Sequence, residues 1–165
     1  HMKKLKCGKR PVNKFMNALK PLKKKLGPVL FQLPPGWGCD PERLESFIST
    51  LPGGYRYTFE FRNKEWFTKD VLDILGASGC AFCIYDLNGE LSPKELTADF
   101  VYIRLHGPRG PYKGKYSRGD LAGWAGALSS WHAKDLDVYC YFDNDEKGYA
   151  VFNALELKRM MGPQT

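Results

Sequence analysis

The stretch VYIRLHG, residues 101–107, combines the pattern of a buried β-strand with charged side chains on one of its faces. Apolar residues alternate with polar or aromatic ones, and a period of two is typical of a strand. Arg104 and His106 therefore share a face, and His106 lies where the strand ends and Gly107 turns the chain. A strand of this kind predicts a sheet with a polar site at one edge.

Four other short runs show the same pattern of a strand with polar side chains on one face. They are Val29–Leu33, Arg56–Phe61, Ala81–Tyr85 and Val138–Phe142. In most cases a turn and then a helical pattern follow, and parallel strands need such a crossover between them. The sequence predicts an α/β fold with about five parallel strands and flanking helices. Right-handed crossovers would curl such a sheet toward a TIM-barrel-like fold. The barrel would be partial, because five strands are too few to close the eight-stranded barrel.

Turn and capping residues place the helices around these strands. The opening helix starts near Pro11, is interrupted at Pro21 and ends at Gly27. Its expected buried stripe is Val12, Phe15, Leu19, Leu22 and Leu26. The expected N-caps of the later helices are Asp40, Thr68, Ser117 (in a capping box with Asp120) and Asp145. The last helix is expected to present Val151, Ala154, Leu155 and Lys158, and residues 92–96 to form at most two helical turns.

Length, composition and cysteine number limit the class of protein. A chain of 165 residues with 43% apolar residues is expected to form one domain, residues 3–165, after His1 and Met2, which resemble a cloning remnant. Neither a long apolar run nor a signal-peptide pattern is present, so we expect a soluble cytoplasmic protein without a membrane partner. The five cysteines are odd in number and mostly lie in predicted strands, which favours free thiols.

The positive charge is concentrated at the start of the chain. Residues 1–25 contain ten Lys or Arg residues and no acid, within a net charge of +7. A basic segment of this kind fits nucleic acid or another polyanion. The simpler interpretation is a solvated helix face, which we favour because no aromatic residues interleave with the lysines to stack on bases.

Polar side chains close the predicted strands at their carboxyl ends. Because these ends meet at one edge of a parallel sheet, we expect the side chains to converge on one site. The members of this group are Glu60, Arg62, Asp86, Arg104, His106, Tyr139, Tyr141 and Asp143. Glu60 and Arg62 fit either a structural ion pair or a functional one, and a buried pair contributes little net stability. His106 fits either a structural role or a general acid or base.

The loop after the fourth strand, residues 107–116, reads GPRGPYKGKY. Its glycines allow backbone N–H groups to approach an anion, and its cations attract phosphate or carboxylate. The spacing matches neither the dinucleotide nor the P-loop fingerprint, so it identifies no nucleotide. An ordinary surface loop is the alternative.

No metal site is predicted, although four residues have suitable chemistry. Glu60, Asp86, His106 and Asp143 would suit a divalent cation if they met. None of them shows the local spacing of metal ligands, and Cys80 and Cys83 point to opposite faces of a strand. We therefore expect no cofactor, and keep a divalent metal as the alternative.

Several segments together resemble the YecE-like family, also known as domain of unknown function 72. The matching segments include residues 26–35, FEFR at 59–62 with Trp66, YIRLHG at 102–107, Tyr116-Ser117, Trp124, and residues 139–153. The resemblance implies a TIM-barrel-like fold with these residues around the strand carboxyl ends, and no established reaction. The further ligand-binding residues that it implies are Gln32, Trp66, Gly107, Tyr116, Tyr141 and Asn144.

The sequence departs from the family at its start, because the βα units with which members usually begin are missing. The chain is either a shortened member or a fragment. Its first and last strands would then present unpaired edges. We expect the opening helix to cover one edge, or two chains to pair through them.

These observations favour a site for a small anionic, phosphate-bearing ligand, and they leave open whether the protein is an enzyme. His106 would act as acid or base, with Glu60 or Asp143 as its carboxylate partner and Arg62 and Arg104 as anion-binding groups. Metal-assisted hydrolysis is one form of this hypothesis. The alternatives are a nucleic-acid-binding or assembly module that uses the basic helix and the 107–116 loop, and a chain without surviving activity.

Overall fold

The computed structural model describes residues 5–6 and 8–162, so His1, Met2 and Cys7 lie outside the described residues. The chain divides into two compact units, one ending at Phe82 and one beginning at Cys83. We refer to them as the first unit and the second unit. Strand β3 (Ala81–Leu87) crosses the boundary between them.

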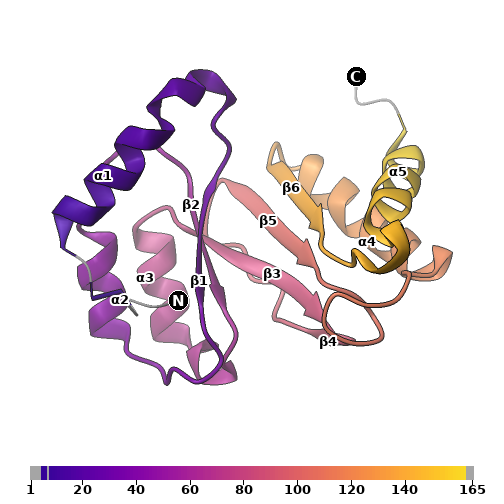
Figure 1. The fold of residues 1–165 in the computed structure, drawn as a ribbon, viewed down its shortest axis with the longest axis horizontal. Helices are drawn as coiled ribbons and strands as arrows, with labels where there is room; N and C mark the ends of the chain where they lie inside the picture. The colour runs from indigo at the N-terminus through magenta and orange to yellow at the C-terminus, as the bar shows by residue number, and fades with distance from the viewer. Residues whose placement is uncertain (1–4, 7, 163–165) are drawn as a thin grey trace. The chain divides into compact units, whose positions relative to one another are not determined.

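The first unit holds two complete parallel strands with helices beside them (Figure 1). Its elements are α1 (Lys9–Leu19), the 3₁₀ segment η1 (Lys20–Lys25), β1 (Val29–Leu33), α2 (Pro41–Ile48), β2 (Tyr57–Phe61), η2 (Lys64–Trp66) and α3 (Lys69–Ala77). Strand β1 pairs in parallel with β2, and β2 pairs in parallel with the first residues of β3. Helices α2 and α3 pack against each other.

Aromatic side chains form much of the core of this unit. Phe31 meets Phe47 of α2 edge-on at 5.0 Å between ring centroids, and Phe61 stacks on Trp66 at 4.9 Å. The side chain of Asp40 accepts a hydrogen bond from the backbone N–H of Arg43. The Thr68 hydroxyl accepts one from Val71. Both predicted N-caps are confirmed, because each satisfies a backbone donor in the first turn of its helix.

The opening helix differs from its predicted pattern. Pro21 interrupts it as expected, since α1 ends at Leu19 and η1 follows. The predicted stripe is wrong in part: Phe15 and Leu22 are 48% and 46% exposed, whereas Met16 is buried. Within α1 the buried positions are Val12 and Met16, four residues apart, and Phe15 lies beside this face. For Leu22 the change from α-helical to 3₁₀ geometry after Leu19 breaks the rotation of 3.6 residues per turn on which a continuous stripe depends.

The second unit holds the rest of the parallel sheet. Its elements are β3, β4 (Glu90–Leu91), β5 (Phe100–Leu105), α4 (Arg118–His132), β6 (Asp137–Phe142), η3 (Glu146–Gly148) and α5 (Tyr149–Met161). Strand β5 pairs in parallel with β3 on one side and with β6 on the other. The short β4 turns back antiparallel along β3 after Asn88-Gly89. The segment at 92–96 forms no helix, because Ser92 exchanges hydrogen bonds with the backbone of Tyr85 instead.

Helices α4 and α5 pack against each other and against β6 (Figure 1). The capping box of Ser117 and Asp120 is present. The predicted stripe of α4 is buried, as shown by Leu121, Trp124, Leu128 and Trp131.

Helix α5 buries a different face from the predicted one. Its buried residues are Ala150, Asn153 and Leu157, whereas Val151 and Leu155 are exposed. Asp145 provides no side-chain cap. The helix starts instead after Gly148, whose backbone is left-handed, so it begins later than predicted and the predicted face is turned away from the core.

The predicted α/β class, with about five parallel strands and flanking helices, is confirmed. The hydrogen-bonded order of the strands is β1-β2-β3-β5-β6, with β4 paired to β3. In the described part of the chain, no helix has the length and apolar character needed to cross a bilayer.

Candidate functional site

The carboxyl ends of β5 and β6 bring predicted site residues together in the second unit. These strands are paired in register to their last residues, Leu105 and Phe142. The next bond continues the ladder, because the N–H of Asp143 donates to the carbonyl of Leu105 at 2.8 Å. His106 and Asp143 therefore follow neighbouring strand ends.

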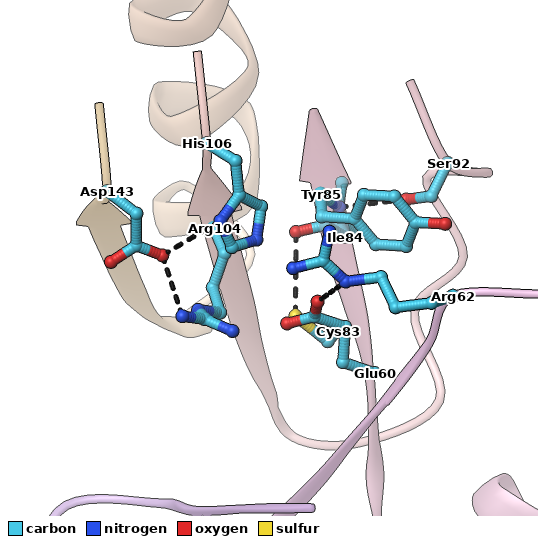
Figure 2. Close-up of polar contacts among 9 residues, drawn as sticks. All are labelled: Glu60, Arg62, Cys83, Ile84, Tyr85, Ser92, Arg104, His106 and Asp143. Atoms are coloured by element: carbon cyan, nitrogen blue, oxygen red, sulfur yellow. Dashed lines mark hydrogen bonds and ion pairs between the residues drawn. The ribbon is translucent and has the colours of Figure 1, made fainter. Parts of the chain in front are cut away.

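The carboxylate of Asp143 contacts the side chain of Arg104 in β5 and that of His106, which directly follows β5 (Figure 2). Its Oδ2 atom lies 2.8 Å from a terminal nitrogen of Arg104 and 3.2 Å from Nδ1 of His106. The His106 side chain is fully buried, while those of Arg104 and Asp143 are 18% and 26% exposed. A carboxylate at Nδ1 favours the tautomer that carries its proton there, which makes Nε2 the basic nitrogen.

Tyr112 covers His106. Its ring meets the imidazole edge-on at 5.5 Å between centroids, and its backbone N–H donates to the His106 carbonyl at 2.7 Å. Tyr112 has a left-handed backbone, with φ of 64°, and its own side chain is 48% exposed. A ligand that is to reach the imidazole from this side must first displace the Tyr112 ring.

The turn at Gly107 requires glycine. Its φ is 118°, and a Cβ atom at this position would lie 2.2 Å from the backbone oxygen of Lys113. The N–H of Gly107 donates to the Tyr116 hydroxyl at 2.9 Å. This hydrogen bond joins the first and last residues of the 107–116 loop.

Two buried asparagines attach this loop to α5 and to the end of β6. Asn144 donates to the carbonyl of Gly114 at 2.8 Å and to Oδ1 of Asn153 at 3.0 Å. Asn153 in turn accepts from the N–H of Tyr116 and donates to its carbonyl, each at 3.1 Å. Both asparagines are fully buried. Asn144, a predicted ligand-binding residue, thus holds the loop in place.

Asp86 closes β3 beside the same loop. Burial raises the pKa of its carboxyl, even though hydrogen bonds from the Tyr116 side chain and the Gly89 backbone lower it. The backbone carbonyl of Asp86 accepts from the N–H of His106 at 2.8 Å. Asp86 and Tyr116 also line a pocket of about 330 Å³ together with Gly89, Leu91, Lys94, Pro108, Asp120, Gly123 and Trp124.

The first unit contains a second predicted group, the ion pair of Glu60 and Arg62 (Figure 2). The carboxylate of Glu60 binds Nε of Arg62, and both side chains are buried, at 0% and 7% exposure. Gln32 of β1 is in register with Glu60 of β2, which puts the two on the same face of the sheet. The predicted convergence of Glu60 with His106 and Asp143 stays a prediction.

Two further residues implied by the family resemblance have clear structural surroundings. Trp66 is fully buried, and its indole N–H donates to the carbonyl of Trp37 at 2.9 Å. Tyr141 is 42% exposed and packs against Tyr102 at 5.0 Å between ring centroids. Trp66 therefore packs within the first unit, whereas Tyr141 remains accessible on β6.

Sequence reasoning missed Tyr112 and Asn153. For Asn153 a signal was present, since it lies at the helical spacing of Ala150 and Leu157, and a polar residue on a buried helix face needs a partner. For Tyr112 no local signal exists, because its contact with His106 depends on the path of the loop.

Metal ligation by the protein would require several of these polar side chains to converge. In residues 5–6 and 8–162, no three His, Cys, Asp or Glu side chains are arranged to hold a metal ion. The cysteines described there, Cys39, Cys80, Cys83 and Cys140, are thiols that take part in no disulfide.

The chain is similar to proteins whose function is unknown. The family model "Protein of unknown function DUF72" matches residues 1–165. A DUF72 family protein of Thermotoga maritima MSB8 is 26% identical, with a TM-score of 0.84 over 94% of this chain and 66% of that one. A DUF72 family protein of Enterococcus faecalis V583 is 18% identical, with a TM-score of 0.82 over 96% and 68%. This chain thus spans about two thirds of their lengths. No curated protein matches it.

Proposed function

Since this chain belongs to the DUF72 family of proteins of unknown function, we propose its function from its own side chains: it binds a small anionic, phosphate-bearing ligand and exchanges a proton with it. The observation that supports this proposal is the single carboxylate of Asp143 shared by Arg104 and His106 at the ends of two parallel strands. The carboxyl ends of such strands are where α/β proteins bind ligands.

His106 is the proton-exchanging group in this proposal. Nδ1 of the imidazole lies 3.2 Å from the Asp143 carboxylate, so a proton on this nitrogen would face an acceptor of opposite charge. Access to the imidazole then requires movement of Tyr112, which an arriving ligand would displace.

Arg104 is the anion-binding group. Its guanidinium carries five N–H donors in a planar fork that matches phosphate and carboxylate oxygens. Its side chain is 18% exposed, so it reaches the surface of the unit beside the carboxylate of Asp143. An anionic ligand bound there would lie next to both the carboxylate and the imidazole.

Thermal unfolding in the presence of phenyl phosphate tests this proposal. A ligand that binds only the folded protein raises the melting temperature with its concentration. We expect the melting temperature of the wild type to rise. Arg104→Gln should need at least ten times more phenyl phosphate to reach the same rise. The control Arg159→Gln removes the same charge from an exposed position on α5, outside the 107–116 loop, and should respond as the wild type does. Equal responses of both variants, or no rise in the wild type, would contradict the proposal.

Proton exchange is tested separately from binding. His106→Gln keeps the size of a planar polar side chain and removes the titratable group. We expect it to bind phenyl phosphate within a few-fold of the wild type. Calorimetry in buffers of different ionisation enthalpy measures the protons exchanged on binding, and the number should differ between the variant and the wild type. The titration of the phosphate itself is common to both proteins and cancels in this difference. Equal proton exchange in the two proteins would exclude His106 as the exchanging group.

The remaining expectations extend the same proposal. Glu60 and Arg62 form the second candidate group, and metal-assisted hydrolysis is the form of the reaction in which carboxylates hold a cation. The thiols outside disulfides support a reducing, cytoplasmic location. Pairing of two chains through sheet edges also remains part of the proposal.

A further inference from the structure

A pocket in the first unit has the chemistry of an anion site, separate from the residues discussed above. It has a volume of about 290 Å³ and lies between η1 and the loop that joins α2 to β2. Its lining residues are Leu19, Lys20, Lys23, Leu26, Gly53, Gly54 and Tyr55. This volume is at the lower end of the range for small-molecule sites, which suits a ligand about the size of one nucleotide.

The charge of this pocket is entirely positive. Lys20 and Lys23 are both exposed, and no acidic residue lines the pocket. Within the described part of the chain, neither lysine forms an ion pair with a carboxylate. The neighbouring Lys24 and Lys25 add to the same field. Such a concentration of cations attracts phosphate groups and raises their rate of association.

The fold adds an aromatic residue that the sequence does not place among the lysines. Tyr55 lies some thirty positions after Lys23, yet both line the same pocket. The adjacent Gly53 and Gly54 are exposed and carry no side chains, and a Cβ atom at either position would have no atom within 4 Å. A planar ring can therefore approach Tyr55 over open backbone.

Lys23 adopts an unusual backbone conformation inside η1. Its φ is 49° and its ψ is −127°, a combination that residues with a side chain rarely adopt. The N–H of Leu26 closes the turn by donating to the Lys23 carbonyl at 3.2 Å. Glycine would adopt this conformation without strain. Residues held in strained conformations are concentrated at functional sites, and here the strained residue carries a charge and lines the pocket.

We propose that this pocket binds a nucleotide unit, with its phosphate at Lys20 and Lys23 and its base on Tyr55 between Leu19 and Leu26. Aromatic stacking accepts any base, because every base has a π-face, and lysines bind phosphate without regard to sequence. The ligand is therefore a nucleotide of any base, either free or as part of a single strand. This inference is independent of the function proposed for the second unit.

Binding is measured on the full chain with two probes, adenosine monophosphate by calorimetry and a fluorescein-labelled oligothymidine by anisotropy. We expect at least one of them to bind, and the affinity for the strand to fall with rising salt. Binding of the monophosphate identifies a free nucleotide as the ligand. Binding of the oligonucleotide alone identifies a single strand.

Matched variants locate the binding. Tyr55→Leu should weaken binding about 5- to 150-fold, whereas Tyr55→Phe keeps the ring and should stay within about twofold. Lys20→Gln should reduce the magnitude of the salt slope by about 0.7 for the strand. Lys14→Gln removes the same charge from α1 outside the pocket, and it should leave the affinity for the monophosphate unchanged.

Lys23→Gly separates a binding role from a structural one. Because glycine relieves the backbone strain, the variant should melt at a higher temperature than the wild type, yet bind at least several-fold more weakly. The proposal is overturned if neither probe binds the wild type. It is also overturned if Tyr55→Leu binds as the wild type does, or if Lys14→Gln weakens binding as much as Lys20→Gln.

Discussion

Gly107 shows how a single residue sets the position of the candidate site. It follows His106 directly, and its positive φ turns the chain back so that Tyr112 and Tyr116 reach the strand ends. A side chain at this position would collide with backbone atoms of Lys113, which cannot move aside as a flexible side chain would. The geometry around His106 therefore depends on a residue without a side chain.

Gly107→Ala should lower the free energy of unfolding by more than about 2 kcal/mol, because positive φ and a backbone clash both oppose the new Cβ. Urea denaturation measures the change. Gly126→Ala on the exposed face of α4 is the control, since its new Cβ atom would have no atom within 4 Å and alanine favours helices. It should be more stable than the wild type by about 1 kcal/mol. Equal stabilities of the two variants would contradict this account.

Asp86 makes stability depend on pH in a defined direction. Its folded-state pKa is raised above the ordinary 3.8, so the folded protein holds this proton more tightly than the unfolded chain does. Stability therefore falls as the pH rises from the unfolded pKa through the folded one. Asp86→Asn removes the charge and keeps the shape, and so should avoid this loss.

The stability of Asp86→Asn relative to the wild type should thus increase from acidic pH, below 3.8, to neutral pH. Melting temperatures over this range measure the difference. Asp99→Asn, at an exposed position, is the control for effects of net charge. A difference between Asp86→Asn and the wild type that does not vary with pH would show that burial does not oppose ionisation of Asp86.

Tyr112 packs edge-on against His106 and is itself partly exposed, and we propose that it limits access to the imidazole. Tyr112→Asn removes the ring that meets the imidazole edge-on, and asparagine tolerates a left-handed backbone, so the fold should persist. We expect faster deuterium exchange at the imidazole C2 position of His106, measured by mass spectrometry. An unchanged rate would mean that another group covers the imidazole.

At the scale of elements, the 107–116 loop is held by a helix that is remote in sequence. The side chain of Asn153 on α5 satisfies both the N–H and the carbonyl of Tyr116 and accepts from Asn144. Buried backbone groups that lose their partners are costly. Helix α5 is thus required for the structure of the loop, as well as covering β6.

Asn153→Ala should lower the free energy of unfolding by about 2 to 3 kcal/mol and speed amide exchange at Tyr116. Hydrogen exchange followed by NMR measures both local and global effects. Val151→Ala changes an exposed residue of the same helix and should stay within about 0.5 kcal/mol of the wild type. Slow exchange at Tyr116 in Asn153→Ala would show that the loop is held by other contacts.

At the scale of the whole chain, the order of strands and helices could be predicted because it depends on sequence patterns that span only a few residues. The alternation in residues 101–105 and the caps at Asp40, Thr68 and Ser117 act over a few residues, and each is confirmed. From the sequence alone, Glu60 and Asp143 were both open as partners of His106, and Arg104 had no named partner. The structure puts Asp143 beside both Arg104 and His106, since equal register brings the ends of β5 and β6 together.

Features that depend on the path of a loop or on the exact start of a helix could not be predicted. The buried face of α5 is set by its start after Gly148, and a start a few residues away rotates every side chain. Tyr55 meets the lysines of η1 only because the loop after α2 returns past them. The local sequence of neither segment indicates that Tyr55 and these lysines lie together.

The central claim is that an anion bound at Arg104 changes the electrostatic environment of the His106 imidazole. Two-dimensional ¹⁵N NMR of the histidine side chains tests it on the full chain, with His106→Gln used to assign the signals among the three histidines. We predict a proton on Nδ1 of His106 at high pH, and a saturable shift of both ring nitrogens when inorganic phosphate is added, which Arg104→Gln abolishes. Ring signals of His106 that stay unchanged at saturating phosphate, or that shift equally in Arg104→Gln, would contradict the account.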